Sequence, residues 1–256
     1  MTSTTPSSSS RLVQAAESLA RAHHERYDPS HDFHHVTRVR RQALAIARSL
    51  SSDSSSSSSE APVDLLVVEL AAFFHDLVDK KYLPAGADPA AQGVLEPFWA
   101  QEDAEGELSE QQRRLVERVV DNVSYSKEVR RIKAGEQTEW HLTCRELHCV
   151  QDADKLDAIG AFGIMRCAAY SAITSRPLYL PPPTTSSSQP SPSSTPTGTP
   201  APPASDDSAI AHFHDKLFHL EGMMKTPLGR ELAKKRTETM RRFVEDCERE
   251  WKEGEL

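Results

Sequence analysis

Apolar side chains recur at intervals of three and four residues along most of the chain, and strict apolar–polar alternation is nearly absent. In the N-terminal part this spacing predicts helices at about 9–26, 34–50 and 62–77. Pro62 suits the first position of the third helix. This helix is apolar on nearly every side, so we expect it to be central and buried.

The C-terminal part continues the same pattern. Ser109 and Gln112 stand three residues apart ahead of an apolar run, which predicts a capping box and a helix. A shorter helix ending near Glu102 is expected before it, although Pro97 disfavours a regular helix there. Three more helices are predicted at about 147–170, 208–224 and 227–252. The pattern therefore predicts an all-α fold, either a bundle or an irregular orthogonal assembly.

Three segments consist almost entirely of Ser, Thr and Pro: 1–10, 51–59 and 181–207. Such segments carry too little apolar surface to offset the entropy lost on ordering them, so we expect them to be disordered. The remaining roughly 200 residues suit a single hydrophobic core. We therefore expect a disordered N-terminus followed by one domain over 11–256, with two low-complexity insertions.

The net charge of −8 argues against nucleic acid and anionic lipid as partners. No run of 18 apolar residues and no secretory signal are recognisable, so we expect a cytoplasmic protein, with the nucleus as the alternative. The four cysteines lack CxxC spacing and are expected to be reduced thiols. The sequence does not indicate the oligomeric state.

The dipeptide His75-Asp76 at the end of the apolar helix is the first candidate for chemistry. A carboxylate beside an imidazole is costly to bury without a partner, and a divalent metal ion accepts both ligand types. The alternative is a solvated helix end. Two more His-Asp pairs stand in polar surroundings and are expected to be structural: His31-Asp32 and His214-Asp215.

Two other segments offer further ligands. His35 lies at the edge of the apolar stripe of the second helix, so its ring can face the core. Asp152, Asp154 and Asp157 interrupt an apolar helix. Asp152 has an alternative role as a helix N-cap, and Asp157 falls on nearly the same face as Asp154. At least one of these acids needs a partner inside the protein.

The order of His, His-Asp and Asp on successive helices resembles the HD-domain superfamily of metal-dependent phosphohydrolases. The resemblance is to a bacterial and fungal branch of uncharacterised HD hydrolases, and it covers nearly the whole chain outside the Ser/Pro tracts. It is carried by the segments 31–39, 74–81, 122–127, 151–160, 212–217 and 231–236, together with Thr226.

This resemblance implies an HD-domain helical bundle that binds one divalent metal ion (Mn, Ni, Co, Fe, Zn or Mg). The implied ligands are His35, His75, Asp76 and Asp154. His35 takes the first place because it precedes the Val-x-Arg-Val run, and Asp154 takes the last because it precedes the Lys-Leu pair. Asp152 is the alternative last ligand.

Asp79 resembles the catalytic acid or base of HD enzymes that cleave nucleotide phosphates. It follows His75 by four residues, so a continuing helix places the two on one face; a solvated helix end is the alternative. An anionic ester also needs cationic ligands. Four cations near these residues are candidates: Arg38, Lys80, Lys81 and Lys155. Lys127 is a weaker candidate, and Tyr125 is expected either to pack in the core or to stack on a base.

The resulting hypothesis is a metal-dependent phosphohydrolase that cleaves a phosphoester or phosphoanhydride of a small molecule, with a nucleotide as the expected substrate. The first alternative is a di-iron oxygenase of the HD fold, which needs extra histidines before the last Asp. His141 and His148 stand there, in a polar stretch close to Asp154. The second alternative is a non-catalytic module that binds metal or nucleotide.

Overall fold

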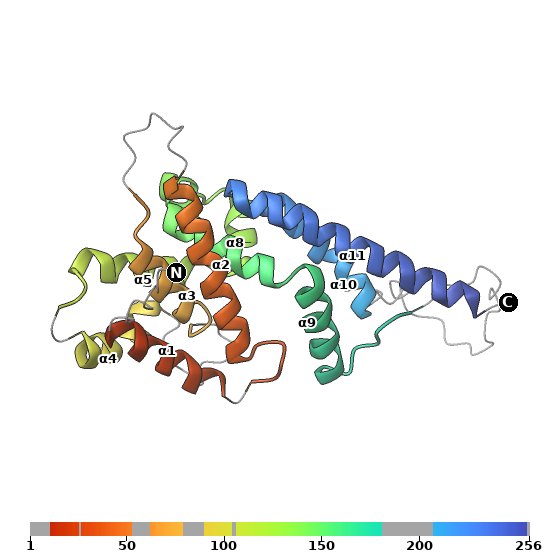
Figure 1. The fold of residues 1–256 in the computed structure, drawn as a ribbon, viewed down its shortest axis with the longest axis horizontal. Helices are drawn as coiled ribbons and strands as arrows, with labels where there is room; N and C mark the ends of the chain where they lie inside the picture. Colours follow the sequence, from red (N-terminus) through yellow and green to blue (C-terminus); the bar gives the residue numbers. More distant parts are fainter. Residues whose placement is uncertain are drawn as a thin grey trace, which may run out of the picture.

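The computed structural model describes residues 11–25, 27–52, 62–78, 90–103, 106–180 and 207–254, and within these ranges the chain is helical with no strand (Figure 1). The elements are α1 (Arg11–His24), α2 (Phe33–Ser52), α3 (Leu65–Phe74), α4 (Ala91–Glu102), α5 (Glu110–Asn122), α6 (Tyr125–Ala134), α7 (Glu139–Thr143), α8 (Arg145–Asp157), α9 (Gly160–Ile173), α10 (Ala209–Asp215), the 3₁₀ helix η1 (Leu217–Met223) and α11 (Pro227–Glu253). The predicted all-α class is confirmed.

Several sequence predictions fall outside the described residues. They concern the N-terminus 1–10, the greater part of both Ser/Pro-rich insertions, and the side chains of Asp79, Lys80 and Lys81. Ser51 and Ser52, expected to open the first insertion, instead form the last residues of α2.

Helix α3 forms the centre of the core, as its sequence predicted. It contacts α1, α2, α5 and α8, and its residues from Val67 onward are all buried except Glu69. The predicted start at Pro62 was too early, because the Asp64 side chain accepts hydrogen bonds from the backbone N–H groups of the residues two and three positions later and thereby caps the helix. The helix ends at Phe74, and His75 directly after it is buried while Asp76 is partly exposed.

The start of α5 was predicted correctly, whereas two helices further along the chain were not predicted. The capping box of Ser109 and Gln112 is present at the start of α5, with both hydrogen bonds formed, and α4 tolerates Pro97 within its length. Helices α6 and α7 were not predicted. Both lie in a charged, polar stretch where few apolar side chains mark a helical face.

The predicted helix over 147–170 is two helices, α8 and α9, bent by 66° at a break after Asp157. Gly160 has a φ of 74°, a left-handed conformation that side chains with a Cβ rarely adopt. The predicted helix over 208–224 is also divided, because Lys216 leaves helical geometry between α10 and η1. In the described part of the chain no single helix is long and apolar enough to cross a membrane, although α8 and α9 together pass that test by length and composition.

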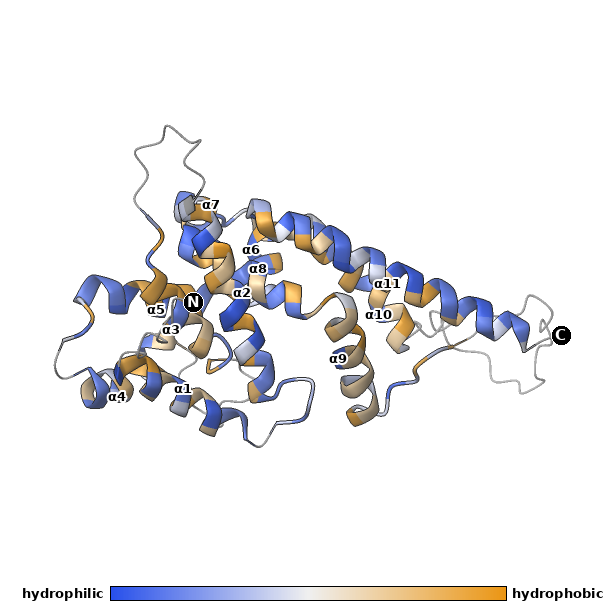
Figure 2. Cartoon of the chain, in the orientation of Figure 1, coloured by the Kyte–Doolittle hydropathy of each residue, from blue (hydrophilic) through white to orange (hydrophobic). Residues whose placement is uncertain are grey.

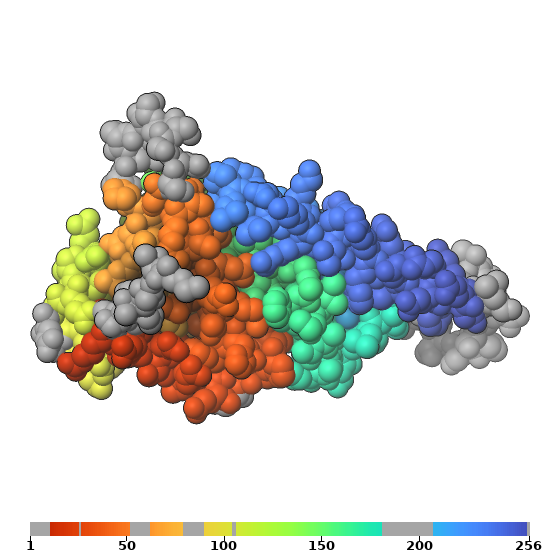
Figure 3. All heavy atoms as spheres, in the orientation of Figure 1, coloured from red at the N-terminus to blue at the C-terminus, as the bar shows by residue number. Residues whose placement is uncertain are grey.

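Helix α11 joins the C-terminal elements to the core. It contacts α2, α8, α9 and η1, and Figure 1 shows it running outward from α8 past α9 and α10. Hydrophobic and hydrophilic residues alternate in bands along it (Figure 2). In Figure 3 it lies directly against the green segment that contains α8 and α9.

Replacing Gly160 by alanine is expected to destabilise the fold. The left-handed backbone alone costs about 1–2 kcal/mol for a residue with a Cβ, and the new Cβ would lie 2.9 Å from Cβ and Cγ of Arg236 on α11. Urea unfolding measures the loss. Gly222→Ala is the control, because a Cβ at Gly222 meets nothing within 4 Å. Equal stability of the two variants would contradict this account of the break.

Candidate metal centre

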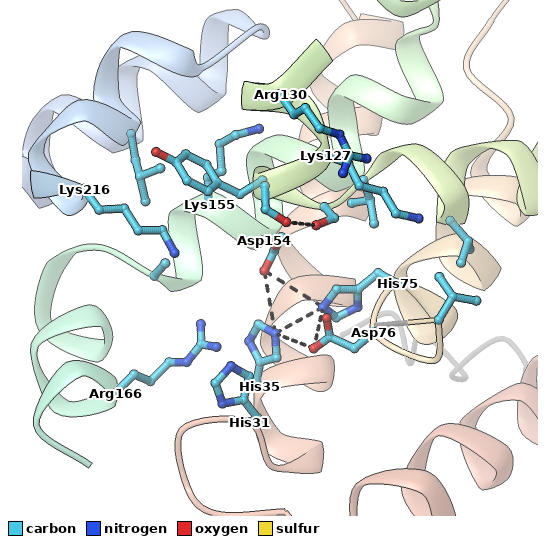
Figure 4. Close-up of a pocket in the computed structure, with 18 residues that line it drawn as sticks. His31, His35, His75, Asp76, Lys127, Arg130, Asp154, Lys155, Arg166 and Lys216 are labelled. Carbon is cyan, nitrogen blue, oxygen red and sulfur yellow. Dashed lines mark hydrogen bonds and ion pairs between the residues drawn. The ribbon is translucent and has the colours of Figure 1, made fainter. Parts of the chain in front are cut away.

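Two imidazole rings from distant segments face each other in the interior. His35 comes from the first turn of α2 and His75 follows the end of α3, and both are buried. Their Nε2 atoms lie 3.1 Å apart. Figure 4 shows both rings pointing toward the carboxylates of Asp76 and Asp154.

The second nitrogen of each ring has its own partner. Nδ1 of His35 donates to Oδ2 of Asp157 at 2.7 Å, and Nδ1 of His75 donates to the backbone carbonyl of Ala72 at 2.8 Å. With Nδ1 protonated, each neutral imidazole directs the lone pair of Nε2 at the other ring. Two lone pairs at this distance repel each other unless a cation lies between or beside them.

Two carboxylates complete the cluster. Oδ2 of Asp76 lies 3.4 Å from Nε2 of His75 and 3.6 Å from Nε2 of His35. Oδ1 of Asp154 lies 3.7 Å from Nε2 of His35 and 3.9 Å from Nε2 of His75. Oδ2 of Asp76 is buried and accepts no well-aligned hydrogen bond. One ligand atom from each of His35, His75 and Asp154 falls within 4.8 Å of the others, so the donor set fits a divalent cation.

The two carboxylates of the cluster favour a positive charge on the imidazole beside them. Burial lowers the pKa of His75, but the carboxylates of Asp76 and Asp154 outweigh burial and raise this pKa to about 9. Burial likewise raises the pKa of Asp76, while His75 and His35 hold it well below its usual range. A bound metal ion would take the place of the proton that this raised pKa keeps on His75.

Asp157 orients His35 and is itself held by two arginines. It accepts from Nε and Nη2 of Arg38 at 2.6 and 3.0 Å, and from Nη1 of Arg166 at 3.2 Å. Burial raises the pKa of Asp157, but the hydrogen bonds from His35 and Arg38 outweigh this and keep the pKa far below its usual range. In the sequence, Asp157 stands out only as a neighbour of Asp154. Its pairing with a residue 122 positions away has no local signal.

Arg38 therefore differs from its expected role. Its guanidinium binds Asp157, lies 4.5 Å from the centroid of the Phe162 ring, and is not among the residues that line the pocket. The prediction that Arg38 binds a substrate phosphate therefore stays a prediction, and in this structure its guanidinium pairs with Asp157.

Asp152 faces away from the cluster. It is fully buried in the interior of α8, so it is not an N-cap. Its carboxylate accepts from the backbone N–H of Lys225 at 3.0 and 3.1 Å, and from the N–H and hydroxyl of Thr226 at 2.8 and 2.7 Å. Asp152 thus anchors the start of α11, while Asp154 is the acid of α8 that meets the two imidazoles.

A cavity of about 310 Å³ opens beside the cluster. His31, His35, His75, Asp76 and Asp154 line one part of it, and Tyr125 with its neighbours on α6 lines another. Five cationic side chains also line it: Lys127, Arg130, Lys155, Arg166 and Lys216 (Figure 4). Of these, the sequence analysis named only Lys127 and Lys155.

Comparison with known proteins gives the family. No protein-family model matches the chain. The protein YpgQ of Bacillus subtilis is 31% identical over 220 residues, which cover 86% of this chain and 84% of YpgQ. The crystal structure of YpgQ in complex with ADP matches with a TM-score of 0.63 and 25% identity, covering 93% of this chain and 97% of that one. The chain belongs to the same family as YpgQ.

The same HD-domain fold occurs more widely. An HD-superfamily hydrolase from Bacillus thuringiensis matches with a TM-score of 0.62 at 23% identity, over 94% of this chain and 96% of that one. A protein from Lactobacillus plantarum matches with a TM-score of 0.64 at 25% identity, over 95% and 98% of the two chains. The chain therefore has the fold of an HD-superfamily hydrolase, as the sequence predicted, and the His75-Asp76 pair follows the end of α3.

Proposed function

We propose that this HD-domain protein is a metal-dependent phosphohydrolase. In this proposal His35, His75, Asp76 and Asp154 hold one divalent cation. The observation that carries it is the pair of inward-facing Nε2 atoms 3.1 Å apart, with two carboxylate oxygens within 4 Å of them. A cation at this point satisfies the buried oxygen of Asp76 and removes the repulsion between the rings.

The surroundings of the cluster support a phosphate substrate, and we propose a nucleotide. Lys155 and Lys216 reach the cavity from α8 and from the junction of α10 with η1, and Lys127 and Arg130 reach it from α6. Charge of this kind suits phosphoryl oxygens. YpgQ has been crystallised with ADP, and the B. thuringiensis neighbour is described as a hydrolase.

Each group has a separate task in the proposed reaction. The bound cation would supply Lewis-acid catalysis for the attack of water on a phosphoryl group. The cationic side chains that line the cavity would hold the phosphate in line, and Tyr125, whose ring centroid lies 4.7 Å from Nζ of Lys216, lines the cavity beside them. Asp79 remains our proposal for the acid or base; the residue before it, Val78, lines the cavity.

The oxygenase alternative receives no support from the histidines on which it depends. Nδ1 of His141 lies 2.8 Å from the Thr138 hydroxyl and Nε2 lies 3.1 Å from Oδ1 of Asn122. Nε2 of His148 lies 2.9 Å from the carbonyl of His141. Neither ring is among the described residues that line the cavity.

Metal content and phosphate release from a nucleotide panel test the proposal together. We expect about one divalent ion per chain, no release after EDTA treatment, and recovery on adding back Mn, Co, Ni or Mg. Two irons per chain would favour the oxygenase instead. A metal-loaded protein that is inert toward the whole panel would favour a non-catalytic module.

A further inference from the structure

Arg166 of α9 lines the cavity beside the proposed metal centre, and two hydrogen bonds hold its guanidinium in place. Nε donates to the backbone carbonyl of Ser30 at 2.7 Å, and Nη1 donates to Oδ2 of Asp157 at 3.2 Å. Ser30 lies in the link between α1 and α2, and Asp157 is the last residue of α8. Figure 4 shows the side chain extending from α9 toward His31 and His35. Acceptors from two separate segments therefore fix the guanidinium before any ligand arrives.

The third nitrogen of this guanidinium, Nη2, remains available to a ligand. It makes no hydrogen bond to the described residues, and it is not one of the buried polar atoms that lack a partner, so it is accessible to solvent. The side chain as a whole is only 14% exposed. Since this side chain borders the cavity, we place its accessible nitrogen on the cavity side.

The charge of Arg166 is not fully neutralised by its partner. Asp157 carries one negative charge and pairs with two guanidinium groups, that of Arg38 at 2.6 Å and that of Arg166 at 3.2 Å. Arginine keeps its positive charge at neutral pH. One positive charge is therefore left over next to the cavity. Of the two arginines only Arg166 lines the cavity, so it is the one placed to meet an anion there.

Two other cations of the cavity are less well placed to act as fixed donors to a ligand. Arg130 of α6 is exposed and makes no hydrogen bond or ion pair with the described residues. Nζ of Lys127 donates to the backbone carbonyl of Asp121 at 3.0 Å. An arginine that is already held loses little side-chain freedom when it binds a ligand, and its planar N–H groups match phosphoryl oxygens.

We propose that Arg166 binds the substrate phosphate in this cavity, with Ser30 and Asp157 holding its guanidinium in position. Oδ2 of Asp157 accepts the hydrogen bonds of both His35 and Arg166, so the arginine stands beside a proposed metal ligand. A phosphoryl group bound to the cation would accept a hydrogen bond from Nη2 of Arg166. The inference rests on the proposed function, because it requires a phosphate at the metal centre.

The variant Arg166→Met tests this assignment, because it keeps an unbranched stem and removes the guanidinium. ADP affinity is measured by calorimetry at saturating Mn²⁺, so that a change in metal affinity does not enter the result. We expect ADP binding to weaken at least about tenfold, as for the loss of one hydrogen bond between charged groups. Inorganic phosphate should lose affinity as well, because the proposed contact is to a phosphoryl oxygen.

Mn²⁺ affinity without nucleotide separates this role from a structural one. Arg166 also supports Asp157, so a purely structural role predicts weaker Mn²⁺ binding and wild-type ADP affinity once Mn²⁺ is saturating. That result would overturn the inference and leave the proposed function standing.

Arg40→Met is the matched control for the loss of a partly buried arginine. Arg40 forms an ion pair with Glu69 and lies 5.0 Å from the centroid of the Phe73 ring, and none of the three residues lines the cavity. We expect this control to lower the melting temperature and to leave ADP affinity unchanged. An equal loss of ADP affinity in Arg40→Met and Arg166→Met would contradict the assignment.

Arg166→Lys serves as the second variant if Arg166→Met does not fold. A lysine keeps the charge but has one nitrogen in place of the three that make separate contacts in Arg166. ADP binding at saturating Mn²⁺ should therefore weaken, and wild-type affinity in this variant would overturn the inference. If the wild-type protein binds neither ADP nor inorganic phosphate in the presence of Mn²⁺, the proposed function fails and the inference fails with it.

Discussion

Replacing Asp154 by alanine is expected to remove metal binding and phosphate release together. Asp154 supplies the carboxylate that approaches both imidazoles from α8, 3.7 and 3.9 Å from their Nε2 atoms. Residues that only hydrogen-bond to a metal ligand already contribute about 10–100-fold to metal affinity. For a direct ligand we therefore expect the metal affinity to fall by at least about 100-fold. Calorimetric titration with Mn²⁺ and a phosphate-release assay measure the two effects on the same preparation.

The control is Asp152→Ala, two residues earlier on the same helix. Asp152 accepts hydrogen bonds from Lys225 and Thr226, and buried donors left without an acceptor cost about 1–3 kcal/mol each. This variant should therefore lose stability toward urea and keep most of its metal affinity and activity. The reverse pattern, with metal lost in Asp152→Ala and kept in Asp154→Ala, would show that the last ligand is misassigned.

Replacing Asp157 by asparagine is expected to weaken metal binding about 10–100-fold, the range measured for outer partners of metal ligands. Asp157 accepts hydrogen bonds from His35, Arg38 and Arg166. An asparagine has one acceptor oxygen, and its NH₂ group would face donors. His35 would lose the bond that keeps its Nε2 unprotonated and aimed at the ion.

The same variant should also be strongly destabilised. Removing one partner of a buried ion pair leaves an uncompensated charge, at a cost of about 3–5 kcal/mol. Urea unfolding of the metal-free protein measures this loss apart from metal binding. Asp152→Asn, in the same helix, is the control and should be destabilised without loss of Mn²⁺ affinity. Wild-type Mn²⁺ affinity in Asp157→Asn would show that the ring of His35 is oriented by other means.

The helical fold was predictable because its signals are local. The spacing of apolar residues marks α1, α2 and α3, and the pair Ser109 and Gln112 marks the start of α5. The break at Gly160 was missed because apolar residues continue at helical spacing on both sides of it. Only the packing against Arg236 shows why the chain needs a residue without a Cβ there.

The candidate site also combines residues that the sequence indicates with residues whose partners only the fold supplies. The His75-Asp76 pair and His35 could be recognised in the sequence because each sets a metal-binding side chain against an apolar helix face, and the resemblance to HD-domain proteins singled out Asp154. No sequence pattern indicated a task for Asp157, and Arg38 was expected at the substrate. These two residues pair with each other across 119 positions of the chain, and such a contact leaves no local signal.

By itself, then, the sequence determined the all-helical class, most of the long helices and the residue types able to bind a cation, because these follow from local spacing and short motifs. Tertiary structure decided which acid of α8 does what: Asp152 anchors α11, Asp154 faces the imidazoles and Asp157 orients His35. The physical reason is that a carboxylate's task depends on which donors reach it. Those donors come from segments that only folding brings together.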